Sequence, residues 1–327
     1  MNRIEIVDGA GFSCAEGDTL LRAGLRAGLG LPYECNAGGC GTCKVELIEG
    51  AVESRWPEAP GLSDRDRRKG RVLACQSLPT GDCRLRLRLD PACIPEIRPE
   101  RRKARLTGMA DITRDIREFR FAAEGPARFR PGQYAMLSLP DGTERAYSLS
   151  NIANADGASH FQIRRVPDGR MTERLFDAAP TEIMLDGPYG LAHLQPGARD
   201  VVCIAGGSGL APMVSIARGI AADPADARRV HFFHGGRTSA DLPGEGWART
   251  LTGLGDRLAY HAAVSDESVP GLAQGFVHEV LAAWMGDRFD NYDYYCAGPP
   301  PMIQALETLL VATKGLPAGR VRFDRFF

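Results

Sequence analysis

The chain has 327 residues, more than one hydrophobic core usually serves, so two or three domains are expected. Its formal net charge is −1, and no basic stripe is interleaved with aromatic residues, which excludes a typical nucleic-acid-binding surface. No apolar run approaches the roughly eighteen residues of a membrane span, and the first residues lack a secretory signal. We therefore expect a soluble, cytoplasmic protein that binds neither nucleic acid nor membrane.

Residues 1–93 predict a small mixed domain wrapped around a metal-binding loop. A helix is expected over Thr19–Leu29, ended by Gly30 and Pro32, with strands over Lys44–Ile48 and Arg84–Leu89. Between them lie four cysteines whose C-x4-C-x2-C spacing, completed by a distant fourth, is typical of a plant-type [2Fe–2S] cluster: Cys35, Cys40, Cys43 and Cys75. Neighbouring glycines allow the loop to wrap closely and to donate backbone N–H groups to sulfur.

Two other interpretations of these cysteines are weighed against the cluster. Zinc sites usually combine two C-x2-C pairs or add histidines, and no histidine lies near. A disulfide framework is disfavoured because nine cysteines in 327 residues are few and odd in number. The remaining five are expected to be free thiols: Cys14, Cys83, Cys93, Cys203 and Cys296.

The rest of the chain predicts a linker and two further domains. Residues 94–103 are rich in proline and charge and are interpreted as a linker. Residues 104–196 contain short strand-like segments separated by turns, which indicate a β-barrel or sandwich. Residues 197–327 alternate apolar runs with helical stretches, which indicates an α/β domain with a parallel sheet; its strands are expected over Val201–Ala205, Val230–His234, Leu258–Val264 and Tyr292–Ala297.

The strand-rich segment carries two patterns suited to a flavin. Arg145, Tyr147 and Ser148 offer a cation for a pyrophosphate, an aromatic ring on the same strand face for stacking, and a hydroxyl for a ring nitrogen. The same residues also suit a plain strand with a surface arginine. A second element, from Arg164 to Thr172, predicts a strand, a glycine turn and a helix start, whose free N–H groups favour a diphosphate.

Two segments of the last domain suit a nicotinamide nucleotide. Val201–Pro212 predicts a buried strand, a glycine-rich turn and a helix beginning near Pro212, although it is not a G-x-G-x-x-G motif. Cys296 and Gly298 follow a later strand, at the edge where ligands bind to parallel sheets. The alternative is that Cys296 only ends a buried strand.

The order of these motifs resembles the reductase components of multicomponent bacterial aromatic-ring oxygenases, of the toluene monooxygenase and carbazole dioxygenase type. In that family a plant-type ferredoxin domain is fused to a ferredoxin–NADP reductase-like module. The resemblance covers essentially the whole chain and includes Leu31–Cys35, Trp56–Leu62, Leu73–Gln76, Asp186–Gly190, Ala205–Pro212 and Phe323–Phe327. It implies a β-grasp [2Fe–2S] domain, an antiparallel β-barrel flavin domain and an α/β nucleotide domain.

The resemblance also implies the site residues. For FAD they are Arg145, Tyr147, Ser148, Arg164, Val166, Gly169, Arg170, Met171, Thr172 and the terminal Phe326 and Phe327, which would cover the flavin. For NADH they are Gly206, Gly207, Ser208, Gly209, Pro212, Arg237, Cys296, Gly298 and Pro299, with Ala297 where the family more often has glycine. Ser148 and Cys296 are expected to position the two reacting rings.

The function that follows is electron transfer from NADH through FAD and the cluster to an oxygenase component or an intermediate ferredoxin. We expect this transient partner to contact the cluster loop near Tyr33, Glu34 and Asn36. NADPH is not excluded, because Arg237 suits a 2′-phosphate whereas Asp241 repels one. The alternatives are a reductase of the same build that serves a diiron hydroxylase or a deoxysugar dehydratase, and a non-catalytic redox-sensing adaptor.

Overall fold

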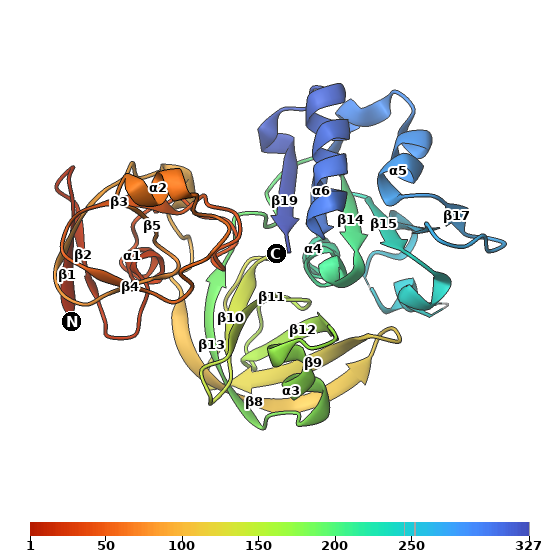
Figure 1. Cartoon of the computed structure of the whole chain (residues 1–327). Helices are drawn as coiled ribbons and strands as arrows, with labels where there is room; N and C mark the ends of the chain where they lie inside the picture. The colour runs from red at the N-terminus through yellow and green to blue at the C-terminus, as the bar shows by residue number, and fades with distance from the viewer. Residues whose placement is uncertain (245, 252, 327) are drawn as a thin grey trace. The chain divides into compact units, whose positions relative to one another are not determined.

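The computed structural model describes every residue of the chain except 245, 252 and 327. The chain folds into two compact units (Figure 1). The first contains residues 1–101 and 186–191, and the second contains residues 102–185 and 192–326. No helix of the described residues has both the length and the apolar character needed to cross a membrane.

The first unit is a five-stranded sheet in the order β2-β1-β7-β3-β5, with β1 and β7 parallel. Helix α1 (Leu20–Arg26) packs against it through Leu20, Leu21 and Leu25, which are fully buried. A two-stranded sheet and a short helix, α2 (Asp64–Arg68), complete the unit. The strands are β1 (Asn2–Ile6), β2 (Gly11–Cys14), β3 (Lys44–Glu49), β4 (Val52–Ser54), β5 (Arg71–Leu73), β6 (Ser77–Pro79) and β7 (Cys83–Arg86).

The predicted elements of this unit are present, with bounds that differ: β3 extends to Glu49, whereas α1 and β7 end earlier than expected. The helix predicted over Thr19–Leu29 ends at Arg26, because Gly28 takes a left-handed backbone conformation with φ +84°. The predicted linker, 94–103, is only partly irregular. Strand β8 (Glu100–Asp111) already begins at Glu100, so the last charged residues of the predicted linker belong to an interior strand of a sheet.

The N-terminal part of the second unit is a six-stranded, nearly closed barrel in the order β11-β10-β13-β8-β9-β12. An isolated bridge between Leu149 and Phe161 joins its two edge strands, and phenylalanines such as Phe119 and Phe121 fill its core. Helix α3 (Arg170–Asp177) follows the last edge strand. The strands are β8 (Glu100–Asp111), β9 (Ile116–Ala123), β10 (Tyr134–Ser138), β11 (Glu144–Ser148), β12 (Ala158–Arg164) and β13 (Glu182–Tyr189).

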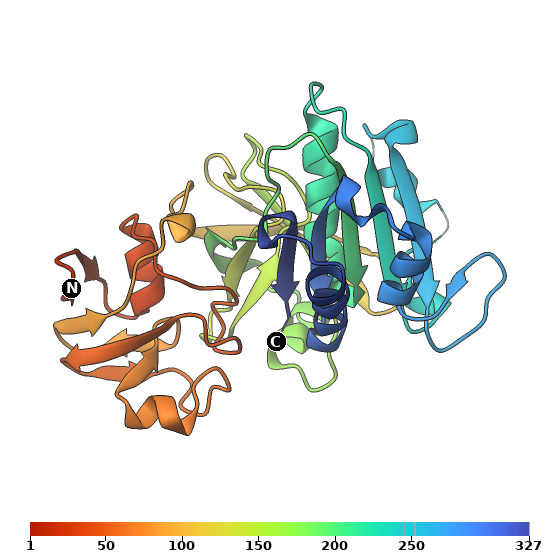
Figure 2. The ribbon, with the colours of Figure 1, turned by 90° about the horizontal axis from the view of Figure 1, so that it is seen from above.

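The C-terminal part of the second unit is a parallel sheet in the order β17-β16-β15-β14-β18-β19. Helix α4 covers one face of the sheet, and α5 and α6 cover the other (Figure 2). The strands are β14 (Asp200–Gly206), β15 (Val230–Gly236), β16 (Leu258–Val264), β17 (Ala273–Gln274), β18 (Tyr292–Gly298) and β19 (Val321–Arg325). The helices are α4 (Leu210–Ala222), α5 (Val277–Met285) and α6 (Pro300–Glu307).

Barrel and sheet share polar contacts within this unit. The Ser215 hydroxyl on α4 donates to the carbonyl of Asn151 at 2.6 Å and accepts from the N–H of Gly132 at 3.2 Å. All three groups are buried, so these bonds replace water and help to fix α4 against the barrel.

Candidate functional site

The four predicted cluster ligands converge as two pairs of thiols in the first unit. Cys35 lies next to Cys40, and Cys43 lies next to Cys75. Hydrogen bonding within the pairs lowers the pKa of Cys40 to about 5 and also lowers the pKa of Cys75. Among the described residues, no three metal-binding side chains gather as they would around a single ion. Two adjacent pairs of thiols fit a two-iron cluster, in which each iron takes two thiolates.

Backbone amides of the same loop point at the sulfur atoms. The N–H groups of Ala37 and Cys40 both donate to the Cys35 sulfur at 3.4 Å, and the N–H of Thr42 donates to the Cys40 sulfur at 3.5 Å. Donors of this kind stabilise thiolate charge and tune a cluster. These three backbone donors thus compensate thiolate charge at two of the four sulfurs, those of Cys35 and Cys40.

Close packing explains the glycines of the loop. Gly38 and Gly41 both have left-handed φ angles, +89° and +78°. A Cβ added to Gly41 would lie 2.5 Å from the carbonyl oxygen of Gly61, and one added to Gly61 would lie 2.6 Å from that of Gly38. The loop and the segment around Gly61 therefore pack backbone against backbone, which only glycine allows.

A buried arginine, Arg22, forms a hydrogen bond to the cluster loop. The Arg22 guanidinium donates to the Asn36 side-chain oxygen at 3.3 Å and lies 3.8 Å from Asp186. Asp186 and Asp18 also pair with Arg26 and Arg101, so both buried carboxylates of this network have cationic partners. The network was missed at the level of sequence because its members are far apart in the chain.

Two of the three residues predicted to meet the partner protein are buried, and that prediction is wrong for them. Asn36 is 1% exposed and held by Arg22, and Tyr33 is 5% exposed. The Tyr33 hydroxyl accepts a hydrogen bond from the N–H of Gly190 at 2.9 Å, and its ring packs edge-on against Tyr189. Only Glu34 of the three is partly exposed.

The first flavin pattern lies on the barrel strand β11. Arg145 is exposed, the Tyr147 ring packs against the barrel core and Ser148 is buried at the strand end. The Ser148 hydroxyl donates to the Asp324 carboxylate on β19 at 3.2 Å. A cation, an aromatic ring and a hydroxyl thus follow one another along one strand, which fits a flavin nucleotide. Asp324 is a site residue that the sequence analysis missed, because nothing local links it to β11.

The second flavin pattern lies partly at the start of α3 and partly, through Arg164, in the pocket at the strand ends. Gly169 precedes α3, and the Thr172 hydroxyl bonds within the turn, where it accepts from the N–H of Val166 at 3.2 Å. The N–H groups at this helix start remain suited to an anion, and Arg170 begins the helix. The Met171 side chain lies in the barrel core, so any contact with a cofactor must come from its backbone.

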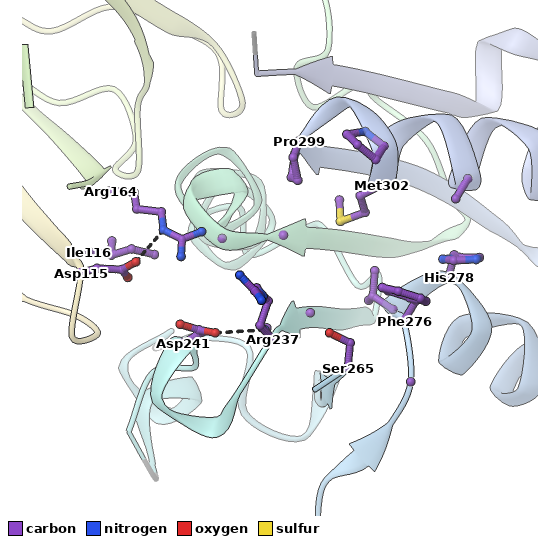
Figure 3. A pocket seen from close by; sticks show the side chains of 18 residues that line it. Asp115, Ile116, Arg164, Arg237, Asp241, Ser265, Phe276, His278, Pro299 and Met302 are labelled. Carbon is purple, nitrogen blue, oxygen red and sulfur yellow. Dashed lines mark hydrogen bonds and ion pairs between the residues drawn. The ribbon is translucent and has the colours of Figure 1, made fainter. Parts of the chain in front are cut away.

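Arg164 lies in the nucleotide pocket. Its Nε donates to Asp115 at 2.6 Å, and its guanidinium would lie 3.2 Å from a Cβ added to Gly207. Figure 3 shows it reaching toward the turn after β14. Its cation therefore faces the predicted nucleotide turn.

The glycine-rich turn after β14 is shaped by contacts with β18. A Cβ on Gly209 would lie 2.0 Å from the carbonyl oxygen of Ala297, and one on Gly206 would lie 2.4 Å from the sulfur of Met302. Helix α4 begins at Leu210, so Pro212 lies buried in its first turn. Gly207 remains open toward the pocket, and Ser208 lies in the short 3-10 turn between strand and helix.

Cys296 lies near the end of β18, with its side chain in the core of the sheet. Alternate residues of β18 face opposite sides of the sheet, so Tyr294 and Cys296 enter the core under α5 and α6, whereas Ala297 faces the α4 side. Burial leaves Cys296 1% exposed and raises the pKa of its thiol well above its ordinary value. Cys296 is thus a core side chain with Ala297 on the other face of the sheet, and its role in positioning the nicotinamide ring stays a prediction.

A cavity of about 450 Å³ lies at the ends of β14, β15, β16 and β18 (Figure 3). Gly206, Gly207 and Pro299 line one part of it, and Gly298 lies beside Gly206. Phe276, which is 60% exposed, and His278 stack on each other at another part of the lining. The carboxyl ends of parallel strands are where such sheets bind ligands, so this cavity is the candidate nucleotide pocket.

The charges of the pocket are largely paired. Arg237, whose side chain is 78% exposed, donates to Asp266 at 2.9 Å. Asp241 accepts from the N–H groups of Arg237 and Thr238, and Arg114 lies 2.6 Å from its other oxygen. These contacts lower the pKa of Asp241, although its burial opposes them. Asp241 is thus an anchor of the loop rather than a free carboxylate.

The chain terminus meets the sheet at Phe326. Its N–H donates to the carbonyl oxygen of Gly298 at 3.1 Å, and its ring packs against the core on the α4 side. Phe327, the other residue predicted to cover the flavin, lies outside the described residues.

Comparison with known proteins agrees with this geometry. Three family models match: a 2Fe-2S iron-sulfur cluster binding domain over residues 5–80, an oxidoreductase FAD-binding domain over 103–193 and an oxidoreductase NAD-binding domain over 203–308. The ferredoxin–NAD(P)+ reductase CarAd of Metapseudomonas resinovorans is 39% identical, with 100% of both chains covered. The ferredoxin–NAD+ reductase component of the Xanthobacter autotrophicus alkene monooxygenase system is 40% identical, with 98% of both covered.

The solved structures agree as well. The ferredoxin reductase in carbazole 1,9a-dioxygenase superposes with a TM-score of 0.92 at 36% identity, covering 100% of this chain and 98% of that one. The Amycolatopsis cytochrome P450 reductase GcoB gives 0.86 at 31% identity, covering 100% of this chain and 99% of that one.

A cluster-binding domain, a flavin-binding barrel and a nucleotide-binding sheet in one chain define an iron–sulfur flavoprotein oxidoreductase. This chain belongs to the family of ferredoxin–NAD(P)+ reductases that serve as electron-transfer components of oxygenase systems. The predicted fold class, the enzyme class and the three cofactors, FAD, a [2Fe–2S] cluster and NAD, are confirmed.

Proposed function

We propose that this chain passes electrons from NADH to an oxygenase component, or to its separate ferredoxin, in a system that hydroxylates an aromatic substrate. The observation that carries the proposal is the full-length likeness to CarAd, which includes the domain order. When bound, FAD accepts the electron pair of NADH and releases single electrons to the cluster, which takes only one at a time.

The chain's own residues bind and orient these groups. Cys35 and Cys40 hold one iron, and Cys43 and Cys75 hold the other, because these are the pairs that lie together. Arg145 and the N-terminus of α3 compensate the charge of the flavin pyrophosphate, while Tyr147 and Ser148 orient its ring. The bond from Ser148 to Asp324 fixes the rotamer of the hydroxyl before the nicotinamide arrives.

The nucleotide pocket is assigned in three parts. Gly206, Gly207 and Arg164 face the pyrophosphate, with the cation of Arg164 opposing its charge. Phe276 and His278 offer aromatic faces for the adenine. Gly298 and Pro299 lie at the strand end on the nicotinamide side.

The expected preference for NADH over NADPH follows from the ion pair between Arg237 and Asp266. A 2′-phosphate needs a free cation, but this guanidinium is paired with Asp266. The Asp266 carboxylate also repels a phosphate at that rim. We expect NADPH to reduce the protein far more slowly than NADH, and Asp266→Ala to improve kcat/KM for NADPH about tenfold with little change for NADH. Stopped-flow reduction by each nucleotide measures both values, and an unchanged ratio would contradict this assignment.

A second candidate acceptor is an oxygenase that acts on a non-aromatic substrate, favoured by the 40% identity to the alkene monooxygenase reductase component. Purified oxygenase and ferredoxin components encoded beside this chain distinguish the two. Turnover of an aromatic substrate with NADH and this reductase supports the first proposal. Turnover only of alkenes supports the second, and no electron transfer to either set of components contradicts both.

A further inference from the structure

We propose that the first unit docks an acidic electron-accepting protein on a basic surface beside the cluster loop. We call it the α2 surface and define it by Trp56, Arg65, Arg67, Arg68, Lys69 and Arg71. The inference rests on the proposed function, because it assumes that electrons leave the cluster for a protein. It replaces the predicted contact with Tyr33 and Asn36, which are buried.

Contacts place this surface directly against the cluster loop. The Trp56 indole would lie 3.1 Å from a Cβ on Gly38, and the N–H of Gly61 donates to the carbonyl oxygen of Gly38 at 3.0 Å. Helix α2 follows three residues after Gly61. Lys44, the residue after the ligand Cys43, pairs with Asp66 of α2 at 3.0 Å. A protein seated on α2 and Trp56 therefore comes close to the cysteines.

The charge of this segment has one clear sign. Residues 62–72 carry five basic and two acidic side chains, in a chain whose total charge is −1. One of the acids, Asp66, is buried and already pairs with Lys44 and Arg71. Arg65, Arg68 and Lys69 are exposed and have no carboxylate partner among the described residues. The surface thus presents unbalanced positive charge to an arriving protein.

Trp56 supplies the apolar anchor that such a surface needs. It is 43% exposed, in contact with the cluster loop, and followed by the exposed Pro57. Tryptophan and arginine are the residues most enriched among those that dominate binding energy at interfaces. A small interface with one aromatic anchor and a charged rim suits a short electron-transfer encounter, in which charge governs the association rate.

The test compares two acceptors that differ in charge but share one haem and one fold. Native cytochrome c is basic, and its succinylated form is acidic. Holoprotein reduced with dithionite is mixed with each in a stopped-flow instrument, and the transfer of one electron from the cluster to ferric haem is followed. The variant Arg65→Glu/Arg68→Glu is compared with Arg3→Glu/Arg88→Glu, which changes the net charge equally. Arg3 lies on β1 and Arg88 follows β7, and β3 separates both strands from β5.

For wild-type protein we expect the succinylated form to be reduced faster at low salt and to slow as salt rises. Charge reversal at Arg65 and Arg68 should slow reduction of the succinylated form about tenfold and speed reduction of native cytochrome c. The control pair should change each reduction rate less than about twofold. Equal effects of both variants, or none, would overturn the α2 surface. Bleaching of cluster absorbance by NADH, and reduction of uncharged menadione, test the reductase function separately and should be normal in every variant.

Discussion

The cluster loop of the first unit and the nucleotide turn of the second are both glycine-rich, but glycine is needed in them for different structural reasons. In the cluster loop, Gly38 and Gly41 take left-handed conformations that let amides turn toward the sulfurs. In the nucleotide turn, Gly206 and Gly209 have negative φ angles, and a Cβ added to them would meet the Met302 side chain of α6 and the Ala297 carbonyl of β18, respectively. The first loop carries three of its four ligands, with Cys75 supplied from a separate segment, whereas the second is completed by β18 and α6. Four substitutions and conditions test this contrast.

The largest effect is expected from removing a ligand. Cys75→Ser should abolish cluster absorbance and lower NADH-driven reduction of cytochrome c at least about tenfold, while flavin absorbance and menadione reduction remain. Cys83→Ser is the matched control, because this buried thiol lies outside the loop and bonds only to backbone carbonyls. Equal loss of the cluster in both variants would contradict the ligand assignment.

A smaller effect, confined to the nucleotide half, is expected from Gly209→Ala. The added Cβ would meet the backbone oxygen of Ala297 at 2.0 Å, so the turn or β18 must shift, at a cost of about 2–3 kcal/mol in the free energy of unfolding. KM for NADH should rise in parallel. Gly207→Ala, where the nearest atom belongs to the flexible Arg164, should cost only about 1 kcal/mol from its φ of +55°. Denaturant unfolding measures the loss of stability in each variant. A larger loss for Gly207→Ala than for Gly209→Ala would refute the packing explanation.

Acid should weaken the second unit and spare the first. All six histidines lie in the second unit, and burial lowers the pKa of His234 from 6.5 to about 4. The folded unit thus resists protonation that the unfolded chain accepts, so stability is complete above pH 6.5 and falls as the pH drops toward 4. Between pH 7 and pH 5 we expect a loss of about 2 kcal/mol in the free energy of unfolding, measured with urea. The loss should shrink in His234→Gln, and an unchanged slope in that variant would contradict the assignment.

The smallest effect concerns the strained residue beside Cys35. Asn36 has φ +51° and its side chain is held by Arg22. Asn36→Gly should lose only the contact with Arg22. Asn36→Ala should lose that contact and also about 1 kcal/mol in the free energy of unfolding, because alanine disfavours the left-handed backbone. The half-life of cluster absorbance in urea should therefore follow the order asparagine, glycine, alanine. A longer half-life for alanine than for glycine would show that the backbone is not the constraint.

The same contrast explains what could be predicted from the sequence. Three of the four ligands share one short stretch with the loop backbone, and the cysteine spacing together with the distant Cys75 predicted the four thiols that the structure brings together. Element types also followed from hydrophobic periodicity: the strand predicted over Leu258–Val264 is observed with the same bounds. Sequence pattern was enough for the features that a single short segment determines, namely the cluster loop and the types of the strands and helices.

Prediction failed where the outcome depends on register or on distant partners. A shift of one residue along β18 exchanges Cys296 for Ala297 on a given face, and the motif alone did not fix which side chain enters the core. Asp324 meets Ser148 only through tertiary packing, and Arg22 buries Asn36 from a separate helix. Each of these contacts joins segments that no short motif connects.

The central claim is that one chain carries electrons from NADH through FAD to its own cluster. The most direct test is the absorption spectrum of the purified holoprotein during anaerobic titration with NADH and, separately, with NADPH. We predict flavin and iron–sulfur bands that are both bleached by low concentrations of NADH, with NADPH much less effective. Cluster absorbance without flavin, or bands that neither nucleotide bleaches, would contradict the reductase function.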